Sequence, residues 1–499
     1  MNATTRQEDR PADYQLTTRL LTALAAVILF LSVSPPVLSK SLSDSEITTA
    51  IQKELRLHDE IPSNQVDIST RDGIVRFTGT VENLLQQQRL TAIAETIKGV
   101  RSVVNRTTLS PIERSDSALS RDVDQSLGGN PATEGRDIEP VVSKGVVVLS
   151  GVVSSWQEKQ LAGQIASSIA GVVEVDNELA ISHPPERSDE EVLRDIRERM
   201  ASDVWVDDGL IVVGVTDGAV TLSGRVGSAA ERTRATIDAW VSGTRSVNTD
   251  SLEVVFDARE SMVRDSLYAG VPDTKISDAL YSAFAYDPRV SPFPVNATVD
   301  SGVVTLTGTV SNLGAKLAAA EDALSTLGVW DIQNEIAVHP EIIPPDDSLK
   351  DAVTQTVRRD AYLYKFDITV TADKGIVYLD GKVNTPFERE HAAEVASQIN
   401  GVIGVVNLLE SRRAQIRPSD RVIKENVESR LVWSPWLNAQ NINVAVDGGI
   451  ITLTGTVNTW AARHEAEQRA FEAGATEVHN RLKVKYLVPA VDTPTNNRM

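Results

Sequence analysis

Residues 145–153 read Gly145-Val-Val-Val-Leu-Ser-Gly151-Val-Val153, and this arrangement of glycines and apolar residues occurs six times in the 499-residue chain. The second glycines of successive copies lie about 72 to 74 residues apart, with one wider gap of about 84. Self-similarity at such a period predicts an array of six small units and disfavours one large domain built around one cleft. We expect the paired glycines to be structural in every copy: Gly73 and Gly79, Gly145 and Gly151, Gly218 and Gly224, Gly302 and Gly308, Gly375 and Gly381, Gly449 and Gly455.

Apolar and polar residues alternate through each copy, which is typical of a strand with one buried face. A turn such as Asp72-Gly73 precedes it, and glycine there permits the positive φ of a tight hairpin. Four residues after the second glycine stands a helix-capping side chain, Asn83 in the first copy. A leading helix and a closing strand complete each unit. The sequence therefore predicts an α+β fold: six αββαβ domains, each a three-stranded mixed sheet with two helices on one face and the other face open.

The N-terminal segment has the layout of a secretory signal. Arg6, Arg10 and Arg19 precede an uncharged stretch at 20–39, which Pro35 and Pro36 interrupt. The stretch also approaches the length that spans a bilayer, so an uncleaved inner-membrane anchor is the alternative. Both interpretations place the six units in a bacterial periplasm or outside the cell, because the arginines would stay cytoplasmic.

The composition excludes several classes of function. The formal net charge is −20, which disfavours nucleic acid as a partner and disfavours a whole surface lying on anionic lipid. The absence of cysteine excludes disulfides, thiolate metal sites and a lipid-modified N-terminal cysteine. The six histidines have no metal-ligand spacing, and no nucleophile or phosphate-binding motif is present. We therefore expect no enzyme activity, no cofactor, no metal and no small-molecule substrate.

The repeated G-x-V-x-L-x-G-x-V pattern, with a downstream valine-asparagine strand such as Gly401-Val-Ile-Gly-Val-Val-Asn407, resembles the BON domain, named for bacterial osmotically inducible and nodulation proteins. The resemblance covers nearly all of residues 41–487. It implies a non-catalytic αββαβ module of the periplasm or outer envelope. The domain boundaries expected are 1–39 for the signal peptide or anchor, 41–112, 116–183, 187–256, 272–340, 346–412 and 418–487 for repeats 1 to 6, and 488–499 for a disordered tail.

Proteins of this kind are associated with phospholipid surfaces, envelope integrity, osmotic stress and, in some members, chaperoning of exported proteins. The resemblance therefore implies an exported envelope protein that binds phospholipid or envelope surfaces and supports osmotic-stress tolerance. The alternative is a periplasmic chaperone or scaffold for exported and outer-membrane proteins. Members usually carry one to three copies, and six copies without a lipoprotein cysteine depart from the lipid-anchored type.

Aromatic residues gather where the leading helices of repeats 5 and 6 end, and basic residues accompany them in repeat 5. Such a cluster suits a lipid headgroup layer, while the alternative is that the rings close the end of a small core. The candidate lipid-contact residues are Arg358, Arg359, Tyr362, Tyr364, Lys365, Trp433 and Trp436.

Proline-bearing joints separate the units at His183-Pro184-Pro185, at Pro344-Pro345 and at Arg417-Pro418. Because proline stiffens and extends a linker, we expect the units to form a string of beads. Each bead would then add a weak contact, and multivalency would raise the total affinity.

Overall fold

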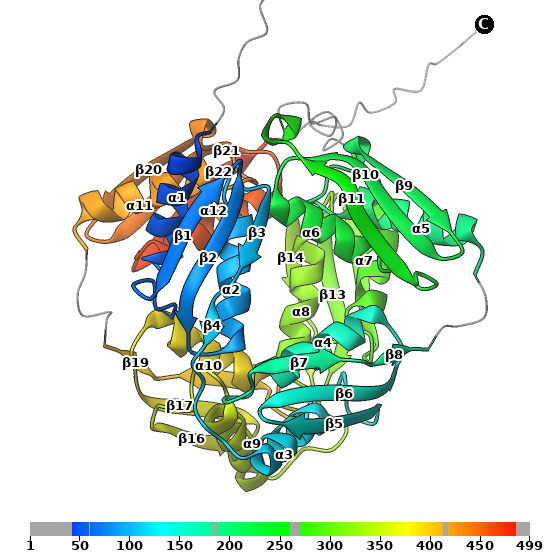
Figure 1. The fold of residues 1–499 in the computed structure, drawn as a ribbon, viewed down its shortest axis with the longest axis vertical. Helices are drawn as coiled ribbons and strands as arrows, with labels where there is room; N and C mark the ends of the chain where they lie inside the picture. The colour runs from blue at the N-terminus through cyan, green and yellow to red at the C-terminus, as the bar shows by residue number, and fades with distance from the viewer. Residues whose placement is uncertain (1–41, 59, 183–186, 260–269, 413–417, 486–499) are drawn as a thin grey trace, which may run out of the picture. The chain divides into compact units, whose positions relative to one another are not determined.

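Each repeat of the computed structural model has a leading helix, a hairpin of two strands, a second helix and a closing strand. The structure describes residues 42–58, 60–182, 187–259, 270–412 and 418–485. Figure 1 shows α3 and α4 of repeat 2 beside the sheet of β5, β6 and β7, and in repeat 1 the two helices pack on their sheet in the same way. The α+β fold of six repeated units is confirmed.

Repeats 1 to 3 contain the following elements. In repeat 1 they are α1 (Asp44–Leu55), β1 (Val66–Arg71), β2 (Ile74–Val81), α2 (Leu84–Glu95), β3 (Ser102–Asn105) and β4 (Thr108–Leu109). In repeat 2 they are α3 (Asp116–Gly128), β5 (Asp137–Ser143), β6 (Val146–Val153), α4 (Trp156–Ser167), β7 (Glu174–Asn177) and β8 (Ala180–Ile181). In repeat 3 they are α5 (Asp189–Ser202), η1 (Asp208–Leu210), β9 (Ile211–Thr216), β10 (Ala219–Val226), α6 (Ala229–Asp238), β11 (Ser246–Val254) and η2 (Phe256–Arg259).

Repeats 4 to 6 continue the same order. In repeat 4 the elements are α7 (Asp273–Tyr286), β12 (Val295–Asp300), β13 (Val303–Val310), α8 (Leu313–Leu324), β14 (Asp331–Asn334) and β15 (Ala337–Val338). In repeat 5 they are α9 (Asp346–Arg359), β16 (Ile368–Asp373), β17 (Ile376–Val383), α10 (Pro386–Ser397), β18 (Gly404–Asn407) and β19 (Glu410–Ser411). In repeat 6 they are α11 (Asp420–Trp433), η5 (Ala439–Asn441), β20 (Ile442–Asp447), β21 (Ile450–Val457), α12 (Trp460–Glu472) and β22 (Glu477–Val484).

The second strand is the centre of every sheet. In repeat 1, β2 pairs with β1 antiparallel and with β3 parallel, and the other repeats use the same order. The closing strand is split into two pieces in repeats 1, 2, 4 and 5, but it is continuous in β11 and β22. The sheet is therefore mixed, as the sequence predicts, because the second helix crosses over between two parallel strands.

The two glycines of each pattern meet different steric demands. The hairpin turn of repeat 1 has φ of 53° at Asp72 and 73° at Gly73, and two positive values in succession define the turn that suits a tight hairpin. The second glycine is required by close approach: a Cβ added to Gly151 would lie 1.8 Å from the carbonyl oxygen of Asp137, at the start of the neighbouring strand β5. Any side chain there would separate the two strands.

Capping begins the second helix of each repeat at the residue that the sequence predicts. The side chains of Asn83, Ser155, Ser228, Asn312, Thr385 and Thr459 each accept a hydrogen bond from a backbone N–H three residues later. The inner face of each central strand then packs against the helices, as Val147 and Leu149 do in repeat 2, where both are fully buried. Each repeat thus has its own core.

The repeats also pack against one another. Ala229 of repeat 3 belongs to the core of repeat 1, and Leu84 of repeat 1 belongs to the core of repeat 2. The residues after Ser41 cluster as one compact unit. The expectation of a string of separated beads is therefore wrong for the described repeats, because apolar side chains at the helix ends are buried between neighbours instead of facing water.

Several expectations fall on residues that the structure does not describe. These are the signal or anchor at 1–39, the tail at 488–499, and the joint His183-Pro184-Pro185. Among the helices of the described residues, none has the length and apolar character needed to cross a membrane.

Candidate functional site

The outer faces of the sheets are the surfaces that all six repeats leave open. Along β2 the inner side chains of Val75, Phe77 and Val81 are buried, whereas the outer Ile74 and Arg76 are exposed. The central strands β6, β10, β13, β17 and β21 alternate in the same way, with outer positions exposed or half-buried. Every repeat therefore presents one sheet face that neither its own helices nor another described repeat buries.

The outer faces differ in chemistry from repeat to repeat. Repeat 4 carries Thr305, Thr307 and Thr309 at the outer positions of β13. Repeat 2 carries Val148, Ser150 and Val152 at the equivalent places on β6, and Val141 on β5 pairs with Val148 across the hairpin. Val141 is 61 % exposed. The six faces are thus the same in backbone geometry but offer different side chains to a partner.

The structure packs four of the seven candidate lipid-contact residues within the protein, one in the core of repeat 5 and three against other repeats. Tyr362 and Arg359 are buried, at 3 % and 9 % exposure, and Arg359 donates to the backbone oxygen of Asp122 in repeat 2. Trp433 packs against the core of repeat 1. The ring of Trp436 lies 5.2 Å from that of Trp205 in repeat 3. Tyr362 is part of the core of repeat 5, as the alternative interpretation of rings that close the end of a small core expects, whereas Trp433 and Trp436 contact other repeats.

The remaining candidates of that cluster lie nearer to water. Tyr364 is half-buried, and Arg358 and Lys365 are exposed. The Lys365 ammonium forms an ion pair with Glu82 of repeat 1, with 3.3 Å between Nζ and the carboxylate. A lipid contact in repeat 5 would therefore depend on Arg358 and, after its ion pair opens, on Lys365.

Three interfaces join the repeats in pairs by one recurring contact, in which the end of a leading helix meets the end of a second helix. In the 2–5 interface, Ala170 N donates to Arg359 O and Ala361 N donates to Ser168 O, both at 2.8 Å. In the 3–4 interface, Leu327 N donates to Ser202 O at 2.7 Å, and Val204 N donates to Ser325 O at 2.9 Å.

The 1–6 interface makes one of these two hydrogen bonds. Lys98 N donates to Trp433 O at 2.9 Å. The residue that matches Val204 and Ala361 is Pro435, which has no N–H to donate. Other polar contacts hold this interface instead.

A buried arginine lies at the centre of the 1–6 interface. Arg430 is 2 % exposed, and its guanidinium donates to both carboxylate oxygens of Glu54, at 2.7 and 3.1 Å, across 376 residues of sequence. It also donates to Glu472 at 2.8 Å and lies 3.0 Å from His58 Nε2. Burial alone would raise the pKa of Glu54, but the hydrogen bond from His58 and the charge of Arg430 lower it to about 2. The Glu54 carboxyl group is therefore ionised near neutral pH.

Glu54, His58 and Glu472 lie close enough together to suggest a metal site, with one ligand atom of each within 4.8 Å of the others. Arg430 already donates to both glutamates of this group. A divalent cation would have to displace a guanidinium that is nearly fully buried, and like charges would oppose it. The arrangement is better explained as an ion-pair cluster than as a metal centre.

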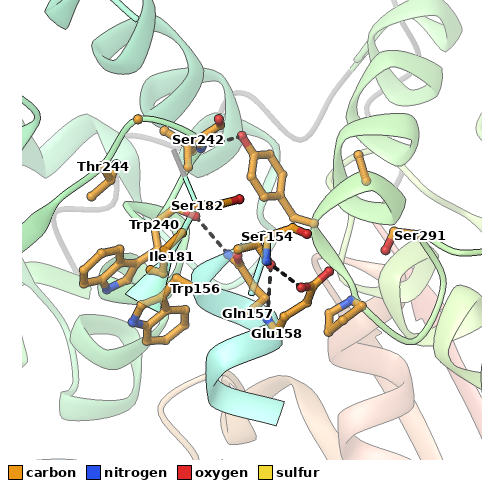
Figure 2. A pocket seen from close by; sticks show the side chains of 16 residues that line it. Ser154, Trp156, Gln157, Glu158, Ile181, Ser182, Trp240, Ser242, Thr244 and Ser291 are labelled. Carbon is orange, nitrogen blue, oxygen red and sulfur yellow. Dashed lines mark hydrogen bonds between the residues drawn. The ribbon is translucent and has the colours of Figure 1, made fainter. Parts of the chain in front are cut away.

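A pocket of about 300 Å³ lies where repeats 2, 3 and 4 meet. Figure 2 shows the rings of Trp156 and Trp240 side by side on its wall, with centroids 5.3 Å apart, and Gln157 donating to the backbone oxygen of Trp240 at 2.9 Å. The carboxylate of Glu158 accepts a hydrogen bond from Ser154 N at 2.8 Å and forms an ion pair with Arg136. The residues that line the pocket include no lysine, arginine or histidine. It therefore offers no cation to a phosphate headgroup.

The chain matches the family described as the BON domain six times, at residues 43–111, 115–182, 188–255, 272–340, 345–413 and 419–486. The chain belongs to the BON domain family. Apart from η2, every helix and strand that the structure describes lies within one of these six segments.

Several named proteins are similar to parts of this BON chain. Osmotically-inducible protein Y of Escherichia coli is 28 % identical over 145 residues, which are 28 % of this chain and 72 % of the relative. The outer membrane lipoprotein DolP of Haemophilus influenzae is 34 % identical over 118 residues, 23 % of this chain and 61 % of the relative. The 21 kDa hemolysin of Actinobacillus pleuropneumoniae is 28 % identical over 119 residues, again 23 % and 61 %.

One solved structure, the C-terminal domain of CdsD, a structural protein of the type III secretion system of Chlamydia trachomatis, aligns over 43 % of this chain and all of that domain. Its sequence identity is 16 % and its TM-score is 0.12. We draw nothing from so low a score.

An aspartate at the start of each leading helix is a structural residue of the BON repeat that sequence reasoning missed. In repeat 1 the carboxylate of Asp44 accepts from Asp72 N and Gly73 N at 2.8 and 2.9 Å, and so ties the helix to the hairpin turn. The signal was present, because an aspartate stands 29 residues before the first glycine of every pattern. The six are Asp44, Asp116, Asp189, Asp273, Asp346 and Asp420.

The recurring asparagine of the closing strand is also structural in five BON repeats. Asn105 Nδ2 donates to Gln87 O on the second helix at 2.7 Å, and its Oδ1 accepts from Thr107 N. Asn177, Asn334, Asn407 and Asn480 donate to their own second helices in the same way. Asn248 in repeat 3 contacts Asp250.

Proposed function

We propose that this chain is a non-catalytic, exported protein of the bacterial envelope, and that its open sheet faces contact envelope surfaces at several points at once. The observation that supports this most is the exposure of one sheet face in all six repeats while the helices are buried within and between repeats. Six weak contacts on one chain would act together, because each contact raises the effective concentration of the next.

The names of the relatives favour the envelope as the location. One is called osmotically inducible and another an outer membrane lipoprotein. We propose by analogy that this chain is periplasmic, as a cleaved product or with a single N-terminal anchor, and that it supports envelope integrity or osmotic-stress tolerance. Phospholipid is the envelope surface that we propose it binds, and Arg358 at the end of α9 and Lys365 in the loop that follows would add basic contacts to those of the sheet faces.

Flotation of the chain with vesicles tests the lipid contact. We expect the protein to float with vesicles that contain phosphatidylglycerol more than with pure phosphatidylcholine vesicles, since the two basic residues favour anionic headgroups. Replacing both, Arg358→Ala with Lys365→Ala, should reduce flotation several-fold. Arg197→Ala removes an equally exposed arginine of α5 and should leave flotation unchanged. Absence of flotation with either vesicle would overturn the phospholipid proposal.

A second candidate function is a chaperone for exported proteins, and the valine face of repeat 2 favours it. Val141 and Val152 are 61 % and 44 % exposed on the same sheet face, and at the position of Val152 repeats 4 and 6 carry Thr309 and Thr456. Unfolded chains expose apolar segments that such a face would bind. The chain should then slow aggregation of reduced, unfolded α-lactalbumin, and Val141→Thr with Val148→Thr should weaken that effect. Equal activity of this variant and the wild type would contradict a role for the face.

A further inference from the structure

Seven charged side chains gather at the 3–4 interface, largely removed from water. Repeat 3 contributes Arg199, Asp203, Arg234 and Asp238, and repeat 4 contributes Asp287, Arg289 and Asp322. Asp203 and Asp238 are 6 % and 3 % exposed. The cluster lies beside the two backbone hydrogen bonds that join Ser202 and Val204 to Leu327 and Ser325.

Four ion pairs satisfy the arginines of the cluster only in part. Arg199 Nε donates to Asp238 Oδ1 at 3.2 Å, and Arg234 Nε donates to Asp203 Oδ2. Arg289 donates to both carboxylate oxygens of Asp287, from Nε to Oδ1 at 3.1 Å and from Nη2 to Oδ2 at 2.7 Å, and its Nη1 donates to Glu321 at 3.0 Å. Asp322 forms none of these pairs.

Two carboxyl oxygens of the cluster are buried without a hydrogen-bond donor. They are Oδ2 of Asp238 and Oδ2 of Asp322. A buried carboxylate that lacks donors is expensive, whereas a protonated carboxyl carries no charge. If Asp238 and Asp322 are neutral, the three arginines balance Asp203 and Asp287 of the cluster together with Glu321, an exposed partner of Arg289 at its edge. If both are ionised, these eight groups have two uncompensated negative charges.

The surroundings of the two groups favour the neutral form. Burial, and then the like charge of Asp203, raise the pKa of Asp238 to about 7 against the opposing effect of Arg199 and Arg234. Burial, and then the charge of Asp287, raise the pKa of Asp322 to about 8 against Arg289, Arg234 and Arg199. In water both groups titrate near 3.8.

We propose that the 3–4 interface is an acid-stabilised contact, in which Asp238 and Asp322 take up protons as repeats 3 and 4 close and release them as the repeats part. When the interface opens, both carboxyl groups reach water and ionise at any pH above about 4. Closing therefore binds protons, and the stability of the interface falls as the pH rises from about 4 to about 8. Above that range the closed interface carries the full cost of two buried charges.

Hydrogen exchange of the full chain measures the opening directly. Backbone amides of residues 202–206 and 325–329, corrected for the intrinsic pH dependence of exchange, report the opening constant of the 3–4 interface. Each linked proton should raise this constant about tenfold per pH unit until the pH passes the pKa of the closed state. For the 1–6 interface, we expect the opening constant reported by amides near Lys98 and Trp433 not to rise with pH between pH 4.5 and 6.

The variants Asp238→Asn and Asp322→Asn, singly and together, replace each carboxyl by a neutral group of the same shape. Each single variant should lower the slope of the logarithm of the opening constant against pH by about one. At pH 8 the interface amides of the double variant should exchange more slowly than those of the wild type. Asp278→Asn, on the exposed side of α7, is the matched control and should keep the wild-type slope. An opening constant of the wild-type 3–4 interface that does not change with pH would overturn the proposal, and this measurement does not depend on any variant folding. A double variant that keeps the full pH dependence would overturn it too.

Discussion

The 1–6 and 3–4 interfaces share one backbone hydrogen bond of the recurring contact but differ in how their charged side chains are paired. In each, the eleventh residue of a leading helix is a buried or half-buried arginine, Arg430 of α11 and Arg199 of α5. The facing leading helix supplies Glu54 at the same position in repeat 1 but only Ala283 in repeat 4. Arg430 is therefore bound by carboxylates on several sides, whereas Arg199 leaves Nη1 buried without a partner.

This difference sets how each interface responds to acid. The pKa of Glu54 is lowered to about 2, so its contribution is present above its ordinary value of 4.5 and is lost only as the pH falls toward 2. The raised pKa values of Asp238 and Asp322 give the reverse sign, with stability lost as the pH rises. The same arrangement of repeats thus permits one interface in which the buried arginine is paired with carboxylates, and another in which carboxyl groups outnumber arginines.

Replacing the buried arginine of the 1–6 interface should have the largest effect. Arg430→Met fills a similar volume but leaves the buried carboxylate of Glu54 without its main counter-ion. Breaking a buried pair on one side costs about 3–5 kcal/mol. We expect hydrogen exchange near Lys98 and Trp433 to speed up by two orders of magnitude or more, as about 1.4 kcal/mol corresponds to tenfold.

Two further variants separate charge from packing in this test. Arg421→Met, on the exposed start of α11, removes an arginine whose side chain is 75 % exposed and should change exchange little. Adding Glu54→Gln to Arg430→Met removes the stranded charge and should restore part of the loss. If Arg421→Met proved equally damaging, the central role of Arg430 would be wrong.

The fold of one repeat follows from the sequence because its signals are local. The caps at Asn83 or Thr385, the turn at Asp72-Gly73 and the close approach at Gly151 each depend on residues that the chain brings together within about 30 positions. The tie between Asp44 and that turn is equally local, and it was missed only because an acidic residue at a helix start also suits the helix dipole.

The interfaces could not be predicted in this way. Arg430 meets Glu54 across 376 residues, and nothing in the α11 sequence distinguishes a buried arginine from a solvated one. Tyr362 and Arg359 resemble a membrane-facing pair in sequence, since aromatic and basic residues suit both a headgroup layer and a boundary between repeats. The burial of Arg359 depends on where repeat 2 lies, which is a property of the whole chain, whereas Tyr362 is buried in the core of repeat 5 itself.

The 2–5 interface provides an intermediate case, because a histidine of repeat 5 binds the aspartate of the same repeat that lies at this interface. His391 Nε2 lies 2.9 Å from Asp360, the residue between the two backbone hydrogen bonds of this interface. Burial alone would lower the pKa of His391, but the Asp360 carboxylate raises it to about 10. The contribution of this pair is complete below the ordinary value of 6.5 and is lost as the pH rises through about 10.

Replacing this histidine should destabilise the 2–5 interface by an intermediate amount. At pH 6, His391→Gln keeps a donor but removes the charge, and a hydrogen bond to a charged group contributes about 1.5–3 kcal/mol. The exchange of amides near Ala170 and Ala361 should speed up accordingly, and the gap between variant and wild type should narrow by pH 10. A gap that stays constant from pH 6 to pH 10 would show that the histidine acts by packing alone.

The smallest expected effect comes from giving the 3–4 interface the backbone of the 1–6 interface. Val204→Pro removes the N–H that donates to Ser325 O, as Pro435 does naturally at the matching position. Val204→Ala shortens the same side chain but keeps the N–H, so the difference between the two variants isolates the hydrogen bond. Leaving a buried carbonyl oxygen unpaired costs about 1 kcal/mol or somewhat more, which is roughly a fivefold change in opening.

The outcome of that pair of variants bears on why the 1–6 interface accepts a proline. If Val204→Pro opens the 3–4 interface more than Val204→Ala does, the missing hydrogen bond is a real loss, and the Arg430 cluster of the 1–6 interface offsets a comparable loss there. If the two variants match, the backbone contact contributes little at either interface. The charged clusters, which differ most between the two, would then determine how firmly each pair of repeats is held.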